Sequence, residues 1–310
     1  MSAGMGNGAS WEASFLAIIQ KQVFHRVPQI PPHIDLHDKT AIVTGSSSGL
    51  GFECARQLLQ LGLTKLILAV RSQSRGQSTL STLQAEFPEA RIEVWILDME
   101  SYQSVQEFAA SCEKLDHLDV VILNAGCGKM HFSRCGGDNC REVTLQVNYL
   151  ATILLTILLI PILKVKASAG ENHGQSFRSP GRITIVGSDM AFWAQIEKTP
   201  GNMLETISSA QAYDGMNQYA TTKLLLPMFV SELVKVVSAD DCIINIVNPS
   251  GVRGTQLMRD ATAILPRLFV FASGVILGRN LQDGTRQYLH SALVLGTEGH
   301  GSFCDWKIRP

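Results

Sequence analysis

The sequence predicts an α/β protein in which a doubly wound parallel sheet is covered by helices on both faces. Short, nearly uninterrupted apolar runs alternate with longer helical stretches along the chain, as in parallel sheets that are buried on both faces. A glycine-rich turn joins the first of these runs to the first helix, and polar residues or glycines end the following runs. Ligands bind at these carboxyl ends of the strands in sheets of this class.

The length and composition fit one large domain. The chain has 310 residues, of which 45% are hydrophobic and 17% charged, below the usual charged share of about 25%. This composition excludes a disordered chain. The net charge of −1, without any basic block, gives no reason to expect nucleic acid as a partner. The expected ligand is a small apolar molecule.

The individual elements follow from the apolar runs. Strands are predicted at Thr40–Thr44, Lys65–Val70, Arg91–Leu97, Leu118–Leu123, Arg182–Val186 and Cys242–Val247, with Gly301–Trp306 as a final strand-like segment. Helices are predicted between them at Gly51–Leu61, Gln73–Phe87, Ser101–Leu115, Asn139–Lys164 and Tyr219–Val237. The polar stretches 166–180 and 197–214 are predicted to be surface loops.

An extension of residues 1–37 precedes this single domain, which we place at residues 38–310. Apolar residues at helical spacing predict an amphipathic helix over Trp11–Val27. Two interpretations stay open: the helix packs on the domain, or it attaches the protein to a membrane surface. The longest apolar run, Tyr149–Leu163, is shorter than the ~20 residues of a membrane span and predicts a buried helix. The N-terminus lacks the positive charge of a signal peptide, so we expect a cytoplasmic protein.

The cysteines indicate neither a disulfide framework nor a metal site. Seven cysteines, an odd number, are scattered over the chain and favour a reducing compartment. His131, Cys135 and Cys140 form the one cluster with metal-ligating side chains, but no second cysteine pair accompanies it as in zinc sites. We expect a polar loop there and no metal.

The glycine-rich turn between the first strand and the first helix runs from Thr44 to Gly51. Gly45 permits the tight turn, Gly49 lets the backbone approach a pyrophosphate, and Gly51 allows the helix to pack close to the sheet. The helix N-terminus then offers free N–H groups to the anion. In this strand–turn–helix context the glycines predict a Rossmann-type dinucleotide site. The alternative is a glycine-rich turn without a ligand.

The residue that ends the second strand indicates which nicotinamide cofactor binds. A carboxylate there, about 20 residues after the turn, would accept hydrogen bonds from the adenosine ribose of NAD. The chain instead has Arg71 followed by Ser72, and a guanidinium forms charge-assisted, bidentate bonds with a 2′-phosphate. NADP(H) is therefore expected over NAD(H); the alternative is a solvated arginine. Asp98 and Asn124–Gly126 end the third and fourth strands at the same edge.

A group of four side chains fits acid–base chemistry. Tyr219 and Lys223 stand at i and i+4, on one face of the predicted helix. A nearby ammonium favours the phenolate, which would bring the phenol pKa toward the working range. Ser188 ends the fifth strand and is placed to donate to a substrate oxygen. Asn148 could hold a water that passes protons to the lysine; alone, each residue also has an ordinary structural role.

In combination, these residues resemble the short-chain dehydrogenase/reductase family over Asp38 to about Arg309. Thr44–Gly51 is similar to the family's glycine motif and Asn124–Gly126 to its structural Asn-Ala-Gly. The resemblance implies a catalytic tetrad of Asn148, Ser188, Tyr219 and Lys223. It also implies cofactor contacts from Gly45, Ser47, Ser48, Gly49, Leu50, Gly51, Arg71, Ser72, Asp98, Met99, Asn124, Ala125, Gly126, Tyr219, Lys223, Pro249, Gly251, Val252 and Thr255. Within the family, the chain resembles the retinol-dehydrogenase-like, NADPH-preferring branch, and Ile185–Ala194 is similar to fungal members tied to secondary metabolism.

Three features depart from the family pattern. Ser188 and Tyr219 lie further apart than in many members, although the retinol-dehydrogenase-like branch commonly carries an insertion here. Pro249-Ser250-Gly251 replaces the usual Pro-Gly, which puts in doubt the loop that cradles the nicotinamide, with Thr255 still placed to bind its carboxamide. The sequence stops at Pro310, where related proteins often continue with another helix.

The substrate side is predicted to be apolar. A lid segment at about 255–278 is rich in leucine, isoleucine and phenylalanine, and Met190, Phe192 and Trp193 follow Ser188. Such walls suit a bulky hydrophobic ketone or alcohol; the alternative is ordinary lid packing. The resulting hypothesis is an NADP(H)-dependent ketoreductase of secondary metabolism. Two rivals stay open: the same fold performing dehydration or cyclisation, and a nucleotide-sensing protein without enzymatic activity.

The helices predicted at Asn139–Lys164 and Tyr219–Val237 are apolar around more of their circumference than one sheet face needs. Related proteins usually dimerise or tetramerise through this pair of helices. We therefore expect a homodimer or homotetramer, unless the helix at Trp11–Val27 covers the same surface.

Overall fold

The computed structural model describes residues 14, 27–136, 141–168, 180–196, 203–211, 213–254, 279–305 and 308–309. Within them the strands form an eight-stranded sheet in the order β3-β2-β1-β4-β5-β6-β7-β8. All neighbouring strands pair in parallel except β7 and β8, which are antiparallel. The order reverses between β1 and β4, and in open α/β sheets ligands bind beyond the carboxyl ends of the strands at such a reversal. The predicted doubly wound α/β fold is confirmed.

All six strands predicted before residue 250 are present, with ends that shift by a residue or two. They are β1 (Thr40–Thr44), β2 (Lys65–Val70), β3 (Arg91–Ile96), β4 (Val120–Leu123), β5 (Gly181–Val186) and β6 (Cys242–Val247). The strand-like segment near the C-terminus contains the short strand β7 (Phe303–Cys304), followed by β8 (Ile308–Arg309). Strands β1, β4 and β6 are buried throughout, as the uninterrupted apolar runs predict.

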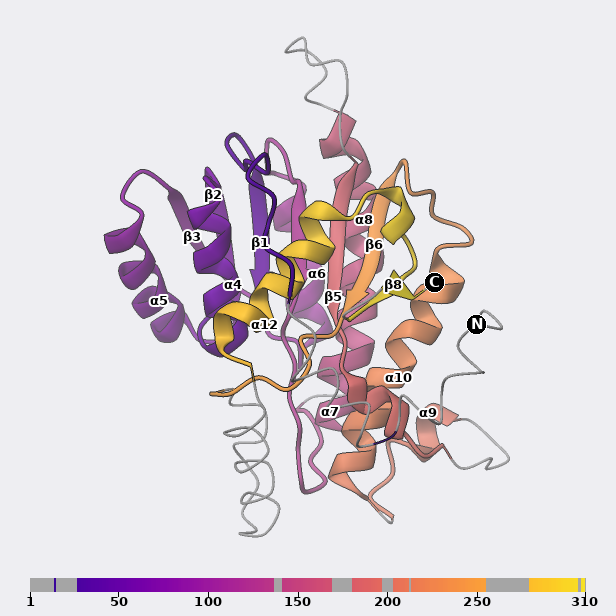
Figure 1. The fold of residues 1–310 in the computed structure, drawn as a ribbon. Helices are drawn as coiled ribbons and strands as arrows, with labels where there is room; N and C mark the ends of the chain where they lie inside the picture. Colours follow the sequence, from indigo (N-terminus) through magenta and orange to yellow (C-terminus); the bar gives the residue numbers. More distant parts are fainter. Residues whose placement is uncertain are drawn as a thin grey trace.

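Helices cover both faces of the sheet (Figure 1). On one face lie α4 (Gly49–Gln60), α5 (Gln73–Glu86) and α12 (Leu281–Leu289), whose buried side chains share a core with β1 and β2. On the other face lie α6 (Tyr102–Cys112), α8 (Thr152–Ser168) and α10 (Gly215–Leu233), which pack on β4, β5 and β6. The sheet therefore has one hydrophobic core on each face, which agrees with the low share of charged residues in the sequence.

The long predicted helix on the second face is continuous but begins later than expected. It consists of a first turn α7 (Val143–Leu145), a π-helical segment Gln146–Ala151, and then α8. The stretch Val143–Lys166 is long and apolar enough to cross a membrane, yet 61% of its most apolar window is buried inside the structure. A core helix of a water-soluble protein has the same properties, which agrees with the predicted buried helix.

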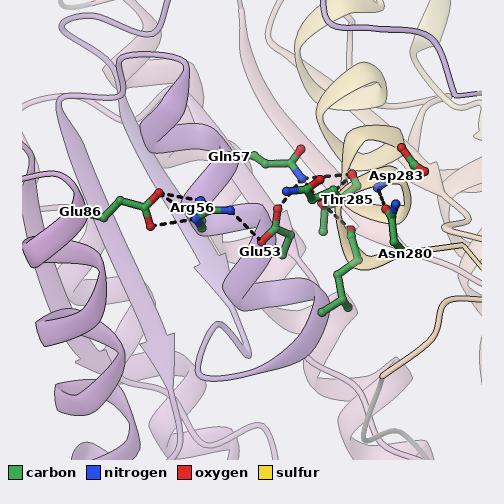
Figure 2. Close-up of polar contacts among 9 residues, drawn as sticks. Glu53, Arg56, Gln57, Glu86, Asn280, Asp283 and Thr285 are labelled. Carbon is green, nitrogen blue, oxygen red and sulfur yellow. Dashed lines mark hydrogen bonds and ion pairs between the residues drawn. The ribbon is translucent and has the colours of Figure 1, made fainter.

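Helix α12 was not predicted from the sequence. Its N-cap is Asn280, whose side chain accepts from the amide of Asp283 at 2.7 Å. Figure 2 shows how Gln57 on α4 joins the two helices: its Nε2 lies 2.6 Å from Oγ1 of Thr285 and 3.1 Å from the carbonyl of Gln282. Helix α4, which follows the glycine-rich turn, is thereby tied to the start of α12.

Polar side chains also join α4 to α5. Arg56 forms two hydrogen bonds with the carboxylate of Glu86, at 2.8 and 2.9 Å, and a longer ion pair with Glu53 (Figure 2). The Arg56–Glu86 pair therefore fixes α5 against α4 on the outer surface of the first face. The lid predicted at 255–278 lies outside the described residues, as does the amphipathic helix predicted at 11–27 apart from Ser14 and Val27.

Candidate active site

The glycine-rich turn has the backbone that a pyrophosphate site requires. Gly45 and Gly49 have φ angles of 65° and 56°, in the left-handed region that favours glycine. A side chain at Gly51 would collide with the carbonyl oxygen of Gly45, whereas the space next to Gly49 is open. Ser48 is the N-cap of α4 but its side chain makes no capping hydrogen bond. The first N–H groups of α4 are therefore available to an anion, and the residues fit a dinucleotide.

Strand β4 stabilises this turn. The side-chain amide of Asn124 donates to the carbonyl oxygen of Thr44 at 2.9 Å, and the amide of Ala125 donates to the Thr44 hydroxyl at 2.9 Å. The side-chain oxygen Oδ1 of Asn124 accepts from the hydroxyl of Tyr288 on α12 at 3.3 Å. The predicted structural role of Asn124 is visible in these contacts, while Tyr288, fully buried, was not identified from the sequence.

The predicted adenosine end of the site lies where β2 and β3 end. Arg71 follows β2 with an exposed side chain, and Ser72 caps α5 by accepting from the amide of Arg75 at 3.4 Å. Asp98 and the buried Met99 follow β3 in the neighbouring position of the sheet. All four residues predicted at this end are therefore close to one another in the fold. Glu100, which the sequence analysis did not single out, forms an ion pair with Arg71.

The loop after β6 contains the predicted contacts to the nicotinamide end. Ser250 has a φ of 62°, and its amide donates to the side-chain oxygen of Asn248 at 3.0 Å. The serine that replaces the family's glycine thus adopts the left-handed conformation with help from Asn248. Gly251 and Val252 pair with Arg279, which closes the base of residues 255–278. Pro249 leads into this turn, and Thr255 lies outside the described residues.

Tyr219 and Lys223 are brought together on the inward face of α10. Both are buried, with 5% and 4% of their surface exposed. The Lys223 ammonium lies 5.7 Å from the centre of the Tyr219 ring and donates to the carbonyl oxygen of Val186 at 2.7 Å. Ser188, two residues after that carbonyl, forms a hydrogen bond with the Tyr219 hydroxyl. The three side chains therefore meet at the carboxyl ends of the central strands.

Asn148 lies in the π-helical segment beside this trio. Its side chain accepts from the amide of Cys127 at 2.8 Å and donates to the Cys127 carbonyl at 2.8 Å. It also donates to the hydroxyl of Thr222 at 3.2 Å, and that hydroxyl donates to the Tyr219 carbonyl at 2.8 Å. Asn148 thus joins the end of β4 to α10. A π-helical turn at such a place is common at functional sites.

The pKa values of the pair are governed by burial. Burial raises the pKa of Tyr219 well above its ordinary value, and Asp189 and Cys127 raise it further, whereas the hydrogen bond with Ser188 lowers it. Burial lowers the pKa of Lys223 to about 8. The i, i+4 spacing predicted that the Lys223 ammonium would bring the Tyr219 pKa toward neutrality; in this structure desolvation of the phenolate outweighs that effect. Tyr219 therefore holds its proton at neutral pH, as an acid does.

Part of the predicted substrate side, next to Tyr219, Lys223 and Ser188, lies within the described residues. Met190, Phe192 and Trp193 follow Ser188 in a short 3-10 helix, with Trp193 40% exposed. Phe192 packs edge-to-face on Phe303, with ring centres 6.1 Å apart. Asp189 adds a carboxylate directly after Ser188, with its Oδ1 3.5 Å from the Ser188 hydroxyl, and it raises the pKa of Tyr219. The segment after Ser188 therefore contains three apolar side chains and one acidic group.

A buried carboxylate, Glu142, holds the elements that carry the site. Its Oε1 accepts from the amide of Thr144 at 2.9 Å and lies 3.0 Å from the Tyr213 hydroxyl. Its Oε2 accepts from the amide of Leu145 at 2.9 Å and from the Gln218 side chain at 2.7 Å. Glu142 thereby caps α7 and binds α10 one residue before Tyr219. The predicted helix Asn139–Lys164 is thus shorter in the described residues, where it begins at Val143 after the cap that Glu142 supplies.

We expect Glu142→Gln to lower the free energy of unfolding by about 1–3 kcal/mol, because one acceptor oxygen becomes an NH₂ group that faces buried donors. Urea denaturation followed by circular dichroism measures the change. Glu113→Gln, an exposed substitution at the end of α6, is the matched control and is expected to stay within ~0.5 kcal/mol. Equal unfolding midpoints for both variants would contradict the role of Glu142.

Five residues near the site were not predicted from the sequence: Glu100, Cys127, Glu142, Asp189 and Tyr288. Burial raises the pKa of the Cys127 thiol to about 12, so that it stays protonated beside Lys223. Glu142 had a detectable signal, since an acid directly before an apolar helix is a typical cap. The other four have no such local pattern, because their partners come from distant strands and helices.

Comparison with known proteins agrees with this geometry. The family model described as short chain dehydrogenase matches residues 39–192. The short chain dehydrogenase virL of Hypocrea virens is 43% identical over 313 residues, which cover 100% of this chain and 88% of the relative. The chain belongs to the short-chain dehydrogenase/reductase family. The short chain dehydrogenase opdN of Penicillium oxalicum is 40% identical, with 97% of each chain covered. The predicted resemblance, including its similarity to fungal members, is confirmed.

Solved structures of the short-chain dehydrogenase/reductase family have the same fold. The RhlG/NADP active-site complex of Pseudomonas aeruginosa has a TM-score of 0.65 at 22% identity, with 89% of this chain and 97% of that chain covered. A short chain dehydrogenase of Escherichia coli CFT073, complexed with NADPH, has a TM-score of 0.61 at 22% identity, with 89% and 100% covered. At this level of identity the likeness shows the fold alone.

Proposed function

We propose that this short-chain dehydrogenase/reductase uses NADP(H) to interconvert a ketone and a secondary alcohol on a bulky apolar metabolite. The observation that carries the proposal is the buried meeting of Tyr219, Lys223 and Ser188 at the strand ends, beside the glycine turn. A protonated phenol, a cation and a hydroxyl donor in one desolvated place are what reduction of a carbonyl needs.

In the proposed mechanism each side chain has one task. When bound, the reduced nicotinamide supplies the hydride that goes to the carbonyl carbon. Tyr219 donates its phenolic proton to the carbonyl oxygen, which becomes the hydroxyl of the product. Ser188 donates a hydrogen bond to the same oxygen and holds it near the phenol. Lys223 stabilises the phenolate that remains, and Asn148, which fixes the end of β4 against α10, keeps the lysine and the tyrosine in register.

The NADP(H) preference is supported by Arg71 and by the first turn of α5. Arg71 is exposed at the end of β2, where a 2′-phosphate would lie, and the first turn of α5 contains no acidic residue. Similar folds hold NADPH or NADP in the Escherichia coli and Pseudomonas aeruginosa complexes. The fungal relatives favour a role in secondary metabolism, where the substrate would be a large ketone.

An NADPH-consumption assay against bulky ketones tests the function. Substrate-dependent loss of absorbance at the reduced nicotinamide band, with a product two mass units heavier, is the expected result. Product formation without NADPH loss would instead establish dehydration or cyclisation on the same fold. NADPH binding without any product from a broad ketone panel would favour a nucleotide-sensing protein. The intact buried trio favours the first result.

We further propose that the protein is a homodimer or homotetramer through α8 and α10. These helices leave apolar side chains at the surface: Ile157 and Val165 on α8 are 48% and 64% exposed, and Met228 on α10 is 38% exposed. Exposed apolar side chains gathered on neighbouring helices are typical of interaction surfaces.

Light scattering at micromolar concentration is expected to give at least twice the 33.8 kDa of one chain. Ile157→Glu is expected to shift the protein toward the monomer, because a charge would then be buried in the interface. Val236→Glu, at an 81% exposed position after α10, serves as the control. A mass near 33.8 kDa for the unsubstituted protein would mean that no second subunit covers these helices.

A further inference from the structure

The adenosine end of the site holds an acidic side chain that no task above uses. Glu100 forms an ion pair with Arg71 through Oε1 and Nη1. Arg71 follows β2 and Glu100 follows β3, and these two strands are neighbours in the sheet. The cation that would bind a 2′-phosphate therefore has an anionic partner within the protein.

The main chain around Glu100 is fixed by several hydrogen bonds. Its amide donates to Oδ1 of Asp98 at 3.0 Å, and the amide of Asp98 donates to the hydroxyl of Ser104 at 2.9 Å. Ser101 then caps α6 by accepting from the amide of Ser104 at 3.2 Å. The main-chain position of Glu100 is thus set by the turn that leads into α6, next to the end of β2 that precedes Arg71.

The two partners differ in exposure. The Arg71 side chain is 58% exposed, whereas the Glu100 side chain is 27% exposed. The guanidinium, with five N–H donors, has surface left for a ligand, but a phosphate bound there would lie close to the Glu100 carboxylate. The negative charges of the phosphate and of the Glu100 carboxylate would then repel one another. The ribose of NAD(H) has no charge at this place and would leave the ion pair intact.

We propose that Glu100 is a specificity-determining residue that competes with the 2′-phosphate for Arg71. It weakens the binding of NADP(H) and has little effect on NAD(H), so that it limits the cofactor preference that Arg71 creates. The inference rests on the proposed binding of a nicotinamide cofactor at this site. It predicts that removal of the Glu100 charge increases selectivity for NADP(H), the opposite of what loss of a supporting contact would do.

The experiment compares Glu100→Gln with the unsubstituted protein. Fluorescence titration gives the Kd of NADPH and NADH, and competition gives the Kd of 2′,5′-ADP and 5′-AMP, which differ by the 2′-phosphate. Glu100→Gln is expected to tighten NADPH and 2′,5′-ADP by about three- to tenfold, the range for one partly exposed ion pair plus one like-charge contact. NADH and 5′-AMP are expected to stay within about twofold. The effect should shrink at high salt, because ions screen exposed charges.

Two further variants make the result decisive. Glu113→Gln removes an exposed negative charge at the far end of α6 and is expected to leave all four constants unchanged. A second comparison sets the double variant Arg71→Gln/Glu100→Gln against Arg71→Gln alone. Here Glu100→Gln should tighten 2′,5′-ADP less than it does when Arg71 is present, because only the like-charge repulsion, and no competition for the guanidinium, is then relieved. Unchanged or weaker binding of 2′,5′-ADP to Glu100→Gln would overturn the proposal.

The single variant Arg71→Gln tests the proposed NADP(H) preference independently of Glu100. If Arg71→Gln weakened NADPH and NADH alike, the proposed NADP(H) preference would fail. If Arg71→Gln weakened NADPH alone while Glu100→Gln tightened nothing, the preference would stand and the competition by Glu100 would be wrong.

Discussion

Replacing Tyr219 with phenylalanine is expected to lower the turnover of a ketone substrate at least about 100-fold, the usual cost of removing a general acid. The phenylalanine ring fills the same buried volume, and only the hydroxyl bonded to Ser188 is lost. The Kd of NADPH should change by less than about threefold, because the phenol provides the proton and little of the cofactor's binding energy. Single-turnover absorbance of NADPH and a separate binding titration measure the two quantities.

Tyr149→Phe is the matched control for this prediction. Tyr149 is a half-buried tyrosine in the π-helical segment, adjacent to Asn148, and burial raises its pKa as it does for Tyr219. The same loss of one hydroxyl near the site should leave turnover within about threefold. If Tyr219→Phe kept activity within tenfold of the unsubstituted protein, Tyr219 would not be the proton donor, and the proposed mechanism would be wrong.

The sequence predicted the central strands closely because their signal is local. Thr40–Thr44, Lys65–Val70 and Cys242–Val247 match β1, β2 and β6 at both ends. Each is an apolar run with a turn or polar residue on either side, and a strand buried on both faces tolerates little else. The same logic placed the polar ends of the strands at one edge of the sheet, where Arg71, Asp98 and Asn124 are found.

Helix α12 illustrates what such patterns miss. Its buried face combines Gly284 and Thr285 with Tyr288 and Leu289, so no apolar run in the sequence indicates this helix. Its position depends on contacts with α4, including that from Gln57, a residue far away along the chain. The N-cap Asn280 with Asp283 three residues on was a usable local signal.

The electrostatics of the site also needed the fold. Spacing places Tyr219 and Lys223 on one face of a helix, but it gives no measure of how deeply that face is buried. Because both side chains are almost fully enclosed, desolvation raises the pKa of the phenol and lowers that of the ammonium to about 8. The pair between Arg71 and Glu100 joins the ends of two strands, and no periodicity in the sequence connects those positions.

Replacing Arg71 with aspartate is the second substitution with a large expected effect, and it tests the cofactor preference. NADPH should bind at least about tenfold more weakly, since a lost charge-assisted pair costs ~1.5–3 kcal/mol before repulsion is counted. Repulsion adds to this, because the new carboxylate and Glu100 would both face the 2′-phosphate. NADH lacks that phosphate, and an aspartate at this position could accept from its ribose hydroxyls, so its Kd should stay within about threefold.

Fluorescence titration of both cofactors decides between the outcomes. Arg91→Asp reverses a charge at the opposite end of β3, on a side chain that is 67% exposed, and controls for the change in net charge. It should leave both Kd values unchanged, since it lies at the amino end of the strand, away from the ligand edge of the sheet. Equal weakening of NADPH and NADH by Arg71→Asp would show that Arg71 shapes the site without discriminating the phosphate, and the proposed NADP(H) preference would fail.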